Sequence, residues 1–231
     1  MVAAFIHLIR VMPAEGNFLT MDIHEWLQLL AQQFKETDWL QWLGLALGVW
    51  EVLLARANKI ALYPTGIAAS GISIYLLWQA GLFAECVLSF YYIVLSLYGW
   101  WYWIKKKDAA PVKISYSTKQ EWMIVGCIVV LGYALLYILL TRFTPSTVPH
   151  WDAWVSSTAW AGMWLLARRK IENWILLNVS NAFAIPLLFK KGLPLYALLT
   201  IFLFVVAVQG YYSWRKKLQK EVHAPTLHPV S

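Results

Sequence analysis

The sequence is poor in charged residues. Asp, Glu, Lys and Arg make up 13% of the 231 residues, whereas they make up about a quarter of a soluble domain. Hydrophobic residues reach 60%, and apolar runs near the ~20 residues that cross a bilayer recur through most of the chain. These features exclude an ordinary soluble domain and indicate a polytopic membrane protein.

The sequence also lacks the residue groups that an enzyme or a metal protein needs. Its two cysteines, Cys86 and Cys127, fall in apolar runs, and there is neither a CxxC pair nor a disulfide framework. The five histidines lie in tails or loops, and no Ser/His/Asp set, HExxH motif, pair of intramembrane acids or phosphate-binding loop occurs. We therefore expect no enzyme, no cofactor and no metal.

Apolar segments predict seven membrane-spanning helices. A shorter amphipathic helix is expected over residues 22–34, capped by Asp22 and lying on the membrane surface. The seven spans are predicted near residues 38–55, 60–79, 82–104, 121–141, 151–168, 171–189 and 194–214.

Basic residues predict the orientation of the chain. Fourteen of the 19 Lys and Arg residues would lie on one side of the membrane, after the first, third, fifth and seventh spans. Because cytoplasmic loops are enriched in Lys and Arg, the N-terminus is predicted outside and the C-terminus in the cytoplasm. The net charge of +7 is then a topology signal, and nucleic acid is not an expected partner.

An internal repeat organises the chain. LLAR at Leu53–Arg56 recurs at Leu165–Arg168, 112 residues later, and GWWYW at Gly99–Trp103 matches GYYSW at Gly210–Trp214, 111 residues later. The first three spans thus correspond to the last three, and the fourth restores the direction of the second copy. The predicted fold is an all-α bundle of seven transmembrane helices in a 3+1+3 arrangement of parallel repeats, with substrate near the midplane between the halves. The expected domains are an N-terminal extension (1–34), repeat 1 (38–104), a linker with the fourth helix (105–141), repeat 2 (151–214) and a cytoplasmic tail (215–231).

The sixth predicted span carries two amides. Trp174, Asn178 and Asn181 fall at i, i+4 and i+7 of Glu172–Pro186, on one face of a helix. An amide without a partner is costly in hydrocarbon, so this face should look into protein or a wet cavity. A ring above two amides can cradle a small polar aromatic molecule; amides that tie neighbouring helices together are the alternative.

The third predicted span carries a polar stripe. Glu85, Ser89, Tyr92 and Ser96 recur at i, i+4, i+7 and i+11, which points them away from lipid. We expect Ser89, Tyr92 and Ser96 to face a pocket between the halves. Hydrogen bonding to neighbouring helices is the alternative.

Other polar residues have simpler expected roles. Asp152 is expected as the N-cap of the fifth span and Trp151 as an interfacial anchor, unless both line an outer vestibule. Glu51, near the cytoplasmic end of the first span, is expected to pair with Arg56. Gly66, in the second span, is expected to allow close helix packing.

A transporter of small solutes explains the repeat, the polar faces and the missing catalytic groups together. A retinal protein or receptor shares the predicted orientation, but retinal attachment needs a lysine in the seventh span, and residues 195–214 contain none. Coupling to protons is not expected, because no acid or histidine is placed at the midplane.

Over most of residues 38–217 the sequence resembles the nicotinamide riboside transporter (PnuC) family of bacterial vitamin transporters. The similarity is carried by ARRKIENW at Ala167–Trp174 with Asn181 beyond it, PHWDA at Pro149–Ala153, and LFAE…YGWWYW from Leu82 to Trp103. The resemblance implies the fold also found in SWEET sugar transporters, a place in the bacterial inner membrane and a homotrimer. It further implies facilitated diffusion of an unphosphorylated B-type vitamin, trapped inside by a separate kinase.

The same resemblance assigns residues and leaves the vitamin open. Trp174 and Asn181 match family positions on the substrate-facing helix, and Trp151-Asp152 match the start of the fifth span. Many members have glutamine in place of Ser89, asparagine near Ser96 and a second tryptophan in place of Leu177. Nicotinamide riboside is the first expectation, thiamine the alternative, and a sugar carried in the SWEET manner the third. Both vitamins are cationic aromatics, which a cation–π contact with Trp174 suits.

Overall fold

The chain folds into helices. The computed structural model describes residues 22–79, 83–105, 113–144 and 146–223; the predicted extension before residue 22 and the tail beyond residue 223 lie outside them. The helices in these residues are α2 (Ile23–Glu36), α3 (Trp39–Ala57), α4 (Leu62–Gln79), α5 (Phe83–Lys105), α6 (Lys119–Phe143), α7 (Pro149–Ala167), α8 (Asn173–Lys190) and α9 (Pro194–His223). The all-helical prediction is confirmed, and each helix lies within about a turn of its expected range, except that α9 continues nine residues beyond residue 214.

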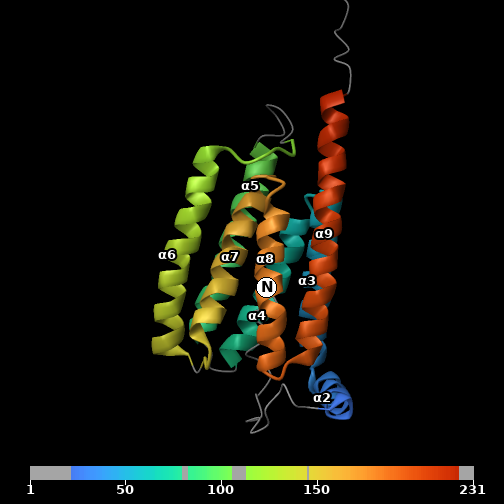
Figure 1. Ribbon diagram of the computed structural model, residues 1–231, viewed down its shortest axis with the longest axis vertical. Coiled ribbons are helices and arrows are strands. Elements are labelled where there is room, and N and C mark those ends of the chain that lie inside the picture. Colours follow the sequence, from blue (N-terminus) through green and yellow to red (C-terminus); the bar gives the residue numbers. More distant parts are fainter. Residues whose placement is uncertain (1–21, 80–82, 106–112, 145, 224–231) are drawn as a thin grey trace, which may run out of the picture.

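Helices α3 to α9 run side by side in one elongated bundle (Figure 1). Helix α4 packs against both α3 and α5, while α8 packs against both α7 and α9. Contacts between α3 and α9 and between α5 and α7 join these two groups. Helix α6 packs mainly on α7, at one side of the bundle.

The outer surface of the bundle is apolar. Large hydrophobic side chains stand exposed on several helices, among them Phe90 on α5, Val130 on α6 and Phe202 on α9. An apolar surface of this extent is unfavourable in water and suited to lipid. By length and composition, three helices in the described residues are able to cross a membrane: Trp39–Ala57, Lys119–Phe143 and Pro194–Lys220.

The shorter helices α7 and α8 are apolar on the whole but carry polar groups inward. Ser157 and Thr158 on α7 and Asn173 and Ser180 on α8 are all buried. These polar groups lower the mean hydropathy of α7 and α8.

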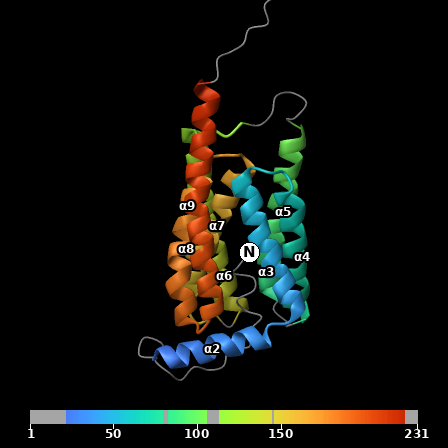
Figure 2. The same ribbon diagram turned by 90° about the vertical axis from the view of Figure 1, so that its right-hand side faces the viewer.

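Helix α2 lies across one end of the bundle (Figure 2). Its predicted cap is confirmed, because Asp22 Oδ1 accepts a hydrogen bond from the backbone N–H of Ile23 at 2.6 Å and completes a capping box with Glu25. The side chain of Gln33 fixes the helix to the α8–α9 turn, donating to the carbonyl of Gly192 at 2.6 Å and accepting from the N–H of Leu195 at 3.3 Å.

The turns that end α3 and α7 have the same geometry. In each, a residue with left-handed φ stands just beyond the helix: Asn58 at 60° and Arg169 at 55°. Each donates its N–H to the carbonyl three residues earlier at 2.9 Å, and the next residue donates to the carbonyl five residues earlier at 2.9 Å. The two turns are 111 residues apart, the spacing of the sequence repeat.

Two tryptophans join the helix groups reciprocally. Trp103, at the end of α5, donates its indole N–H to the carbonyl of Ala167 on α7 at 3.0 Å. Trp214, on α9, donates to the carbonyl of Ala55 on α3 at 3.1 Å. Both rings are buried, so these bonds tie α3–α5 to α7–α9 at the end of the bundle opposite α2.

Candidate functional site: a central cavity

A cavity of about 130 Å³ lies between the two helix groups. Helices α3, α5, α7, α8 and α9 all contribute to its wall. That volume holds several water molecules, while pockets for drug-sized ligands measure about 300–1,000 Å³. The cavity must therefore widen to admit such a ligand. The wall is mainly apolar, and its side chains with polar atoms are Glu51, Tyr92, Ser156, Trp174, Ser180, Asn181 and Thr200.

Helix α8 turns one face to this cavity. Trp174, Leu177, Asn181 and Ala184 are among the residues of that face. Asn178 is not among them, because successive residues turn by about 100° and Asn178 falls at the edge of this face. Its Oδ1 atom is buried without a hydrogen-bond partner in the described residues. Of the predicted trio, the structure brings Trp174 and Asn181 into the cavity but not Asn178.

Trp174 is held firmly where it meets the cavity. The side chain is buried, and its ring meets that of Trp214 edge to face, with centroids 5.7 Å apart. Gly210 makes room for it: a Cβ atom there would lie 2.7 Å from Cε2 of the indole. In the first helix group, Tyr63 meets Trp103 in the same way, with centroids 5.1 Å apart. Trp174 is thus a packed ring as well as a wall of the cavity.

The stripe on α5 points inward, as its spacing predicts. Ser89, Tyr92 and Ser96 are all buried, but only Tyr92 reaches the cavity. The Oγ atom of Ser89 has no hydrogen-bond partner in the described residues. Of the three expected pocket residues, one lines the observed site.

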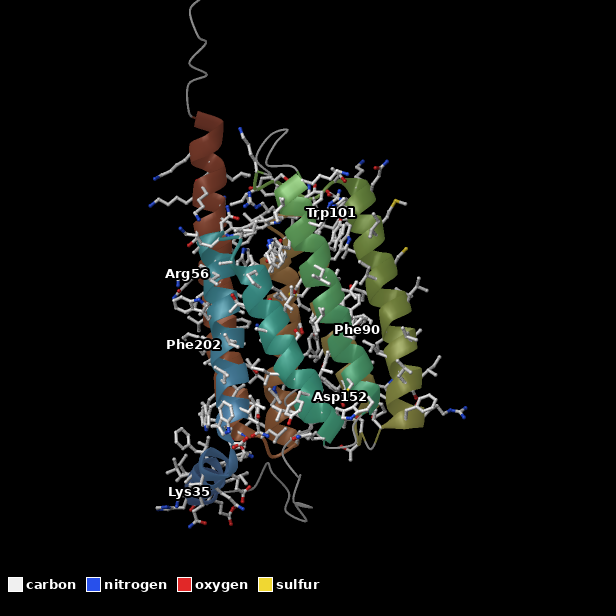
Figure 3. All side chains as sticks on the ribbon, turned by 180° about the vertical axis from the view of Figure 1, so that it is seen from behind. Lys35, Arg56, Phe90, Trp101, Asp152 and Phe202 are labelled. Atoms are coloured by element: carbon white, nitrogen blue, oxygen red, sulfur yellow. The ribbon has the colours of Figure 1, made fainter. Side chains whose placement is uncertain are left out.

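Trp151 and Asp152 lie away from this cavity. Figure 3 shows Asp152 toward the end of the bundle that carries α2. Its carboxylate accepts hydrogen bonds from Nζ of Lys191 at 2.6 and 2.7 Å and from Oγ of Ser146 at 2.6 Å. Trp151 is half exposed and packs on Phe183.

The prediction that Asp152 caps the fifth span is wrong. Helix α7 begins at Pro149, with Val148 as its N-cap. Proline suits the first position of a helix, since it has no N–H to leave unpaired and its φ is already helical. The helix therefore starts three residues before Asp152, whose side chain is free to bind Lys191.

Sequence reasoning missed Glu51. Its side chain lines the cavity and is 3% exposed, and neither carboxylate oxygen has a hydrogen-bond partner in the described residues. The predicted pairing with Arg56 is wrong, because five residues along a helix turn by about 500° and place the two side chains on different faces. The signal was present: an acid within an apolar span is a functional hypothesis by default.

Gly66 on α4 gives Glu51 its space. A Cβ atom on Gly66 would overlap the Glu51 carboxylate and lie 2.7 Å from its Cδ atom. The glycine thus makes room for a side chain of the neighbouring helix α3.

Comparisons with known proteins agree with this architecture. The family model of the nicotinamide mononucleotide transporter matches residues 38–216. The chain is 23% identical to the nicotinamide riboside transporter PnuC of Escherichia coli K12 over 206 residues, which cover 78% of this chain and 86% of that protein. The protein of the same name from Shigella flexneri matches equally. The crystal structure of the vitamin B3 transporter PnuC shares the fold, with a TM-score of 0.63 at 24% identity over 84% of this chain and 90% of that one.

Proposed function

This chain belongs to the nicotinamide mononucleotide transporter family, and from that premise we propose that it carries an unphosphorylated B-type vitamin across the bacterial inner membrane. Nicotinamide riboside is the first candidate. The observation that carries the proposal is the cavity between the helix groups, where an aromatic ring, a phenol and an amide meet in Trp174, Tyr92 and Asn181. Ligand sites combine mostly apolar walls with a few polar groups in this manner.

The proposed cargo contacts divide among these residues. The aromatic ring of the vitamin stacks near Trp174, where a positive ring gains a cation–π contact. Asn181, which offers both a donor and an acceptor, binds a polar substituent of the cargo. Behind the cavity wall, packing is provided by Ser89, Ser96 and Asn178. Cargo would meet Trp151 and Asp152 at the end of the bundle that carries α2.

Thiamine is the second candidate, and the residue at position 177 supports it. Leu177 lines the cavity at a position where many family members have tryptophan. A leucine there leaves one aromatic face fewer for the nicotinamide ring and a wider, apolar wall for a different cation.

We propose that the bundle consists of two parallel three-helix repeats, α3–α5 and α7–α9, linked by α6. The matching turns at Asn58 and Arg169 support this arrangement, as do the reciprocal bonds of Trp103 and Trp214. Transport would then rock one repeat against the other around the central cavity. All seven helices would cross the membrane with the N-terminus outside, α2 would lie in the outer interface, and the transporter would form a trimer.

We propose facilitated diffusion, with trapping inside the cell by a kinase that phosphorylates the vitamin. The alternative is coupling to protons, because Glu51 is a buried acid that could carry one. Uptake into cells with and without a collapsed proton gradient distinguishes the two mechanisms. Equal initial rates are expected, because a uniporter needs no second ion. A strict requirement for the gradient would show proton coupling instead.

Titration of the purified protein identifies the cargo. Tryptophan fluorescence is followed while nicotinamide riboside, thiamine, riboflavin and a neutral sugar are added in turn. Saturable quenching by one vitamin, absent in Trp174→Phe or shifted to higher concentration, is the expected result. A response to the sugar alone would favour a SWEET-like carrier and overturn the vitamin proposal.

A further inference from the structure

Glu51 is an unusual group in this cavity because its carboxyl group is buried and has no hydrogen-bond partner in the described residues. The carboxylate is 3% exposed and unbonded among the described residues. An ionised carboxylate removed from water loses its hydration, and it persists in a protein interior only where a positive charge or hydrogen bonds replace that water.

The described residues place no basic side chain at this site. No Lys, Arg or His is among the side chains that line the described cavity. The remaining polar groups of the wall are hydroxyls, an amide and an indole N–H. The hydroxyl of Thr200 donates to the backbone carbonyl of Tyr196 at 2.8 Å, and that of Ser180 donates to the carbonyl of Val155 at 2.7 Å. No side chain in the described residues compensates a charge on Glu51, so a positively charged cargo or a proton can take that role.

The aromatic groups of the same cavity favour a cation as the visitor. Trp174 and Tyr92 line it together with Glu51, and the faces of indole and phenol rings attract positive charge. A carboxylate and two aromatic rings around one cavity form a site for a permanently charged aromatic cation. If a proton bound to Glu51 instead, the two rings would have no part in binding the compensating charge.

From these observations we propose that Glu51 is the counter-charge for the positively charged ring of the cargo. This inference rests on the proposed function and narrows it: the transporter selects aromatic cations over neutral molecules of the same shape. Glu51 comes from α3, whereas Trp174 comes from α8. A bound cation thus bridges the two helix groups, and the site is complete only when both are in place.

Gly66 positions the counter-charge. A methyl group at this position would overlap the carboxylate, and because the carboxylate is the end of a flexible side chain, it would move aside without unfolding the bundle. Gly66→Ala therefore displaces the charge while Glu51 itself remains in the chain.

Isothermal titration calorimetry of the full-length protein in detergent tests this inference with two matched pairs of ligands. The first pair is nicotinamide riboside and its 1,4-dihydro form, which has the same outline but no charge on the ring. The second is thiamine and its neutral 3-deaza analogue. The variants are Glu51→Gln and Gly66→Ala, and Glu36→Gln removes an equal charge from the exposed face of α2 as the control.

The unaltered protein and Glu36→Gln are expected to bind the cationic member of one pair at least ~10-fold more tightly than its neutral partner, the range that a buried charge contact gives. Glu51→Gln and Gly66→Ala should lose this preference by weakening only for the cation. A folded variant of either kind that keeps the full preference would overturn the inference, as would equal binding of both members by the unaltered protein, although the proposed function would stand. If the unaltered protein binds none of the four ligands, the proposed function fails and the inference fails with it.

Discussion

At the scale of single residues, Asn178 and Asn181 lie on the same helix in different surroundings. Asn181 lines the cavity, whereas Asn178 is off the lining with a buried, unpartnered oxygen. Asn181→Leu is expected to weaken cargo binding ~10-fold or more, the cost of losing a hydrogen bond to a bound polar group. Asn178→Leu, the matched control, should change affinity by less than ~3-fold, because it removes no contact with the cavity.

Calorimetry with the cargo identified by fluorescence measures both changes. Equal losses in the two variants would mean that Asn178 swings into the cavity when cargo binds, and the assignment of α8 faces given above would be wrong.

Gly210 and Gly99 each hold space for a buried ring. A Cβ atom on Gly210 would lie 2.7 Å from the ring of Trp174, and one on Gly99 would lie 2.7 Å from Cζ of Tyr63. Because these rings are packed and cannot move aside cheaply, each Gly→Ala change should destabilise the fold by about 1–3 kcal/mol. Thermal unfolding in detergent measures the loss. The control is Gly71→Ala, where a Cβ meets nothing within 4 Å; a loss equal to that of the control would contradict this packing.

Residue chemistry made part of the site predictable. Trp174 and Asn181 stand at helical spacing in an apolar span, so a shared inward face followed from periodicity alone. Asn178 lies at the edge of the cavity-lining face of α8. Helical periodicity predicts which broad side of a helix faces inward, but not which residues at its edge line the cavity. Glu51 was missed because its position five residues before Arg56 suggested an ion pair at the surface. Five residues rotate about 500° around a helix, so the two side chains lie on different faces.

At the scale of helices, the reciprocal tryptophan bonds are the clearest device. Trp103 and Trp214 each donate one buried hydrogen bond to a carbonyl of the other helix group. Trp103→Phe leaves the buried carbonyl of Ala167 without this donor, which costs about 1–3 kcal/mol. Trp214→Phe removes one bond worth about 0.5–1.5 kcal/mol, because the carbonyl of Ala55 still accepts the backbone N–H of Asn58 at 2.9 Å.

Trp103→Phe should therefore lose at least as much stability in thermal unfolding as Trp214→Phe. Trp122→Phe serves as the control, because Trp122 on α6 is exposed. A loss in both variants no larger than that of Trp122→Phe would contradict the role of these bonds in joining the helix groups.

Helix positions followed from sequence more readily than helix starts. Apolar runs located α3 to α9, because burial in lipid or protein demands long apolar segments. The start of α7 differed from the prediction, because Pro149 occupies the first turn of the helix. Asp152 was chosen as the cap from its residue type alone, without regard to this proline. Local capping preferences are worth ~1 kcal/mol and yield to a proline that fits the first position.

At the scale of the whole molecule, the orientation proposed from basic residues has a direct test. Lys35 lies on α2, and Lys216 lies in the C-terminal part of α9; α2 and the C-terminal end of α9 are at opposite ends of the bundle (Figure 1). In a Cys127→Ser background, Lys35→Cys should react with a membrane-impermeant maleimide added to intact cells, and Lys216→Cys should react only after the cells are opened. The reverse pattern would invert the proposed topology.

The all-helical class was readable from the apolar runs, while the arrangement as two repeats stays a prediction from LLAR and the aromatic motifs. The cavity was not readable, since it depends on how five helices from two groups meet, and no single segment carries that information. Its small volume and buried charge emerge only from the assembled bundle.

The most direct test of the account is counterflow in proteoliposomes. The purified protein is reconstituted into vesicles loaded with an excess of unlabelled nicotinamide riboside, and labelled vitamin is added outside with no ion gradient. A uniporter should accumulate label transiently inside and lose it as the inner pool drains; Glu51→Gln should slow both phases, and thiamine should be run in parallel. No accumulation of either vitamin beyond protein-free vesicles would contradict the proposal that this protein carries vitamins by facilitated diffusion.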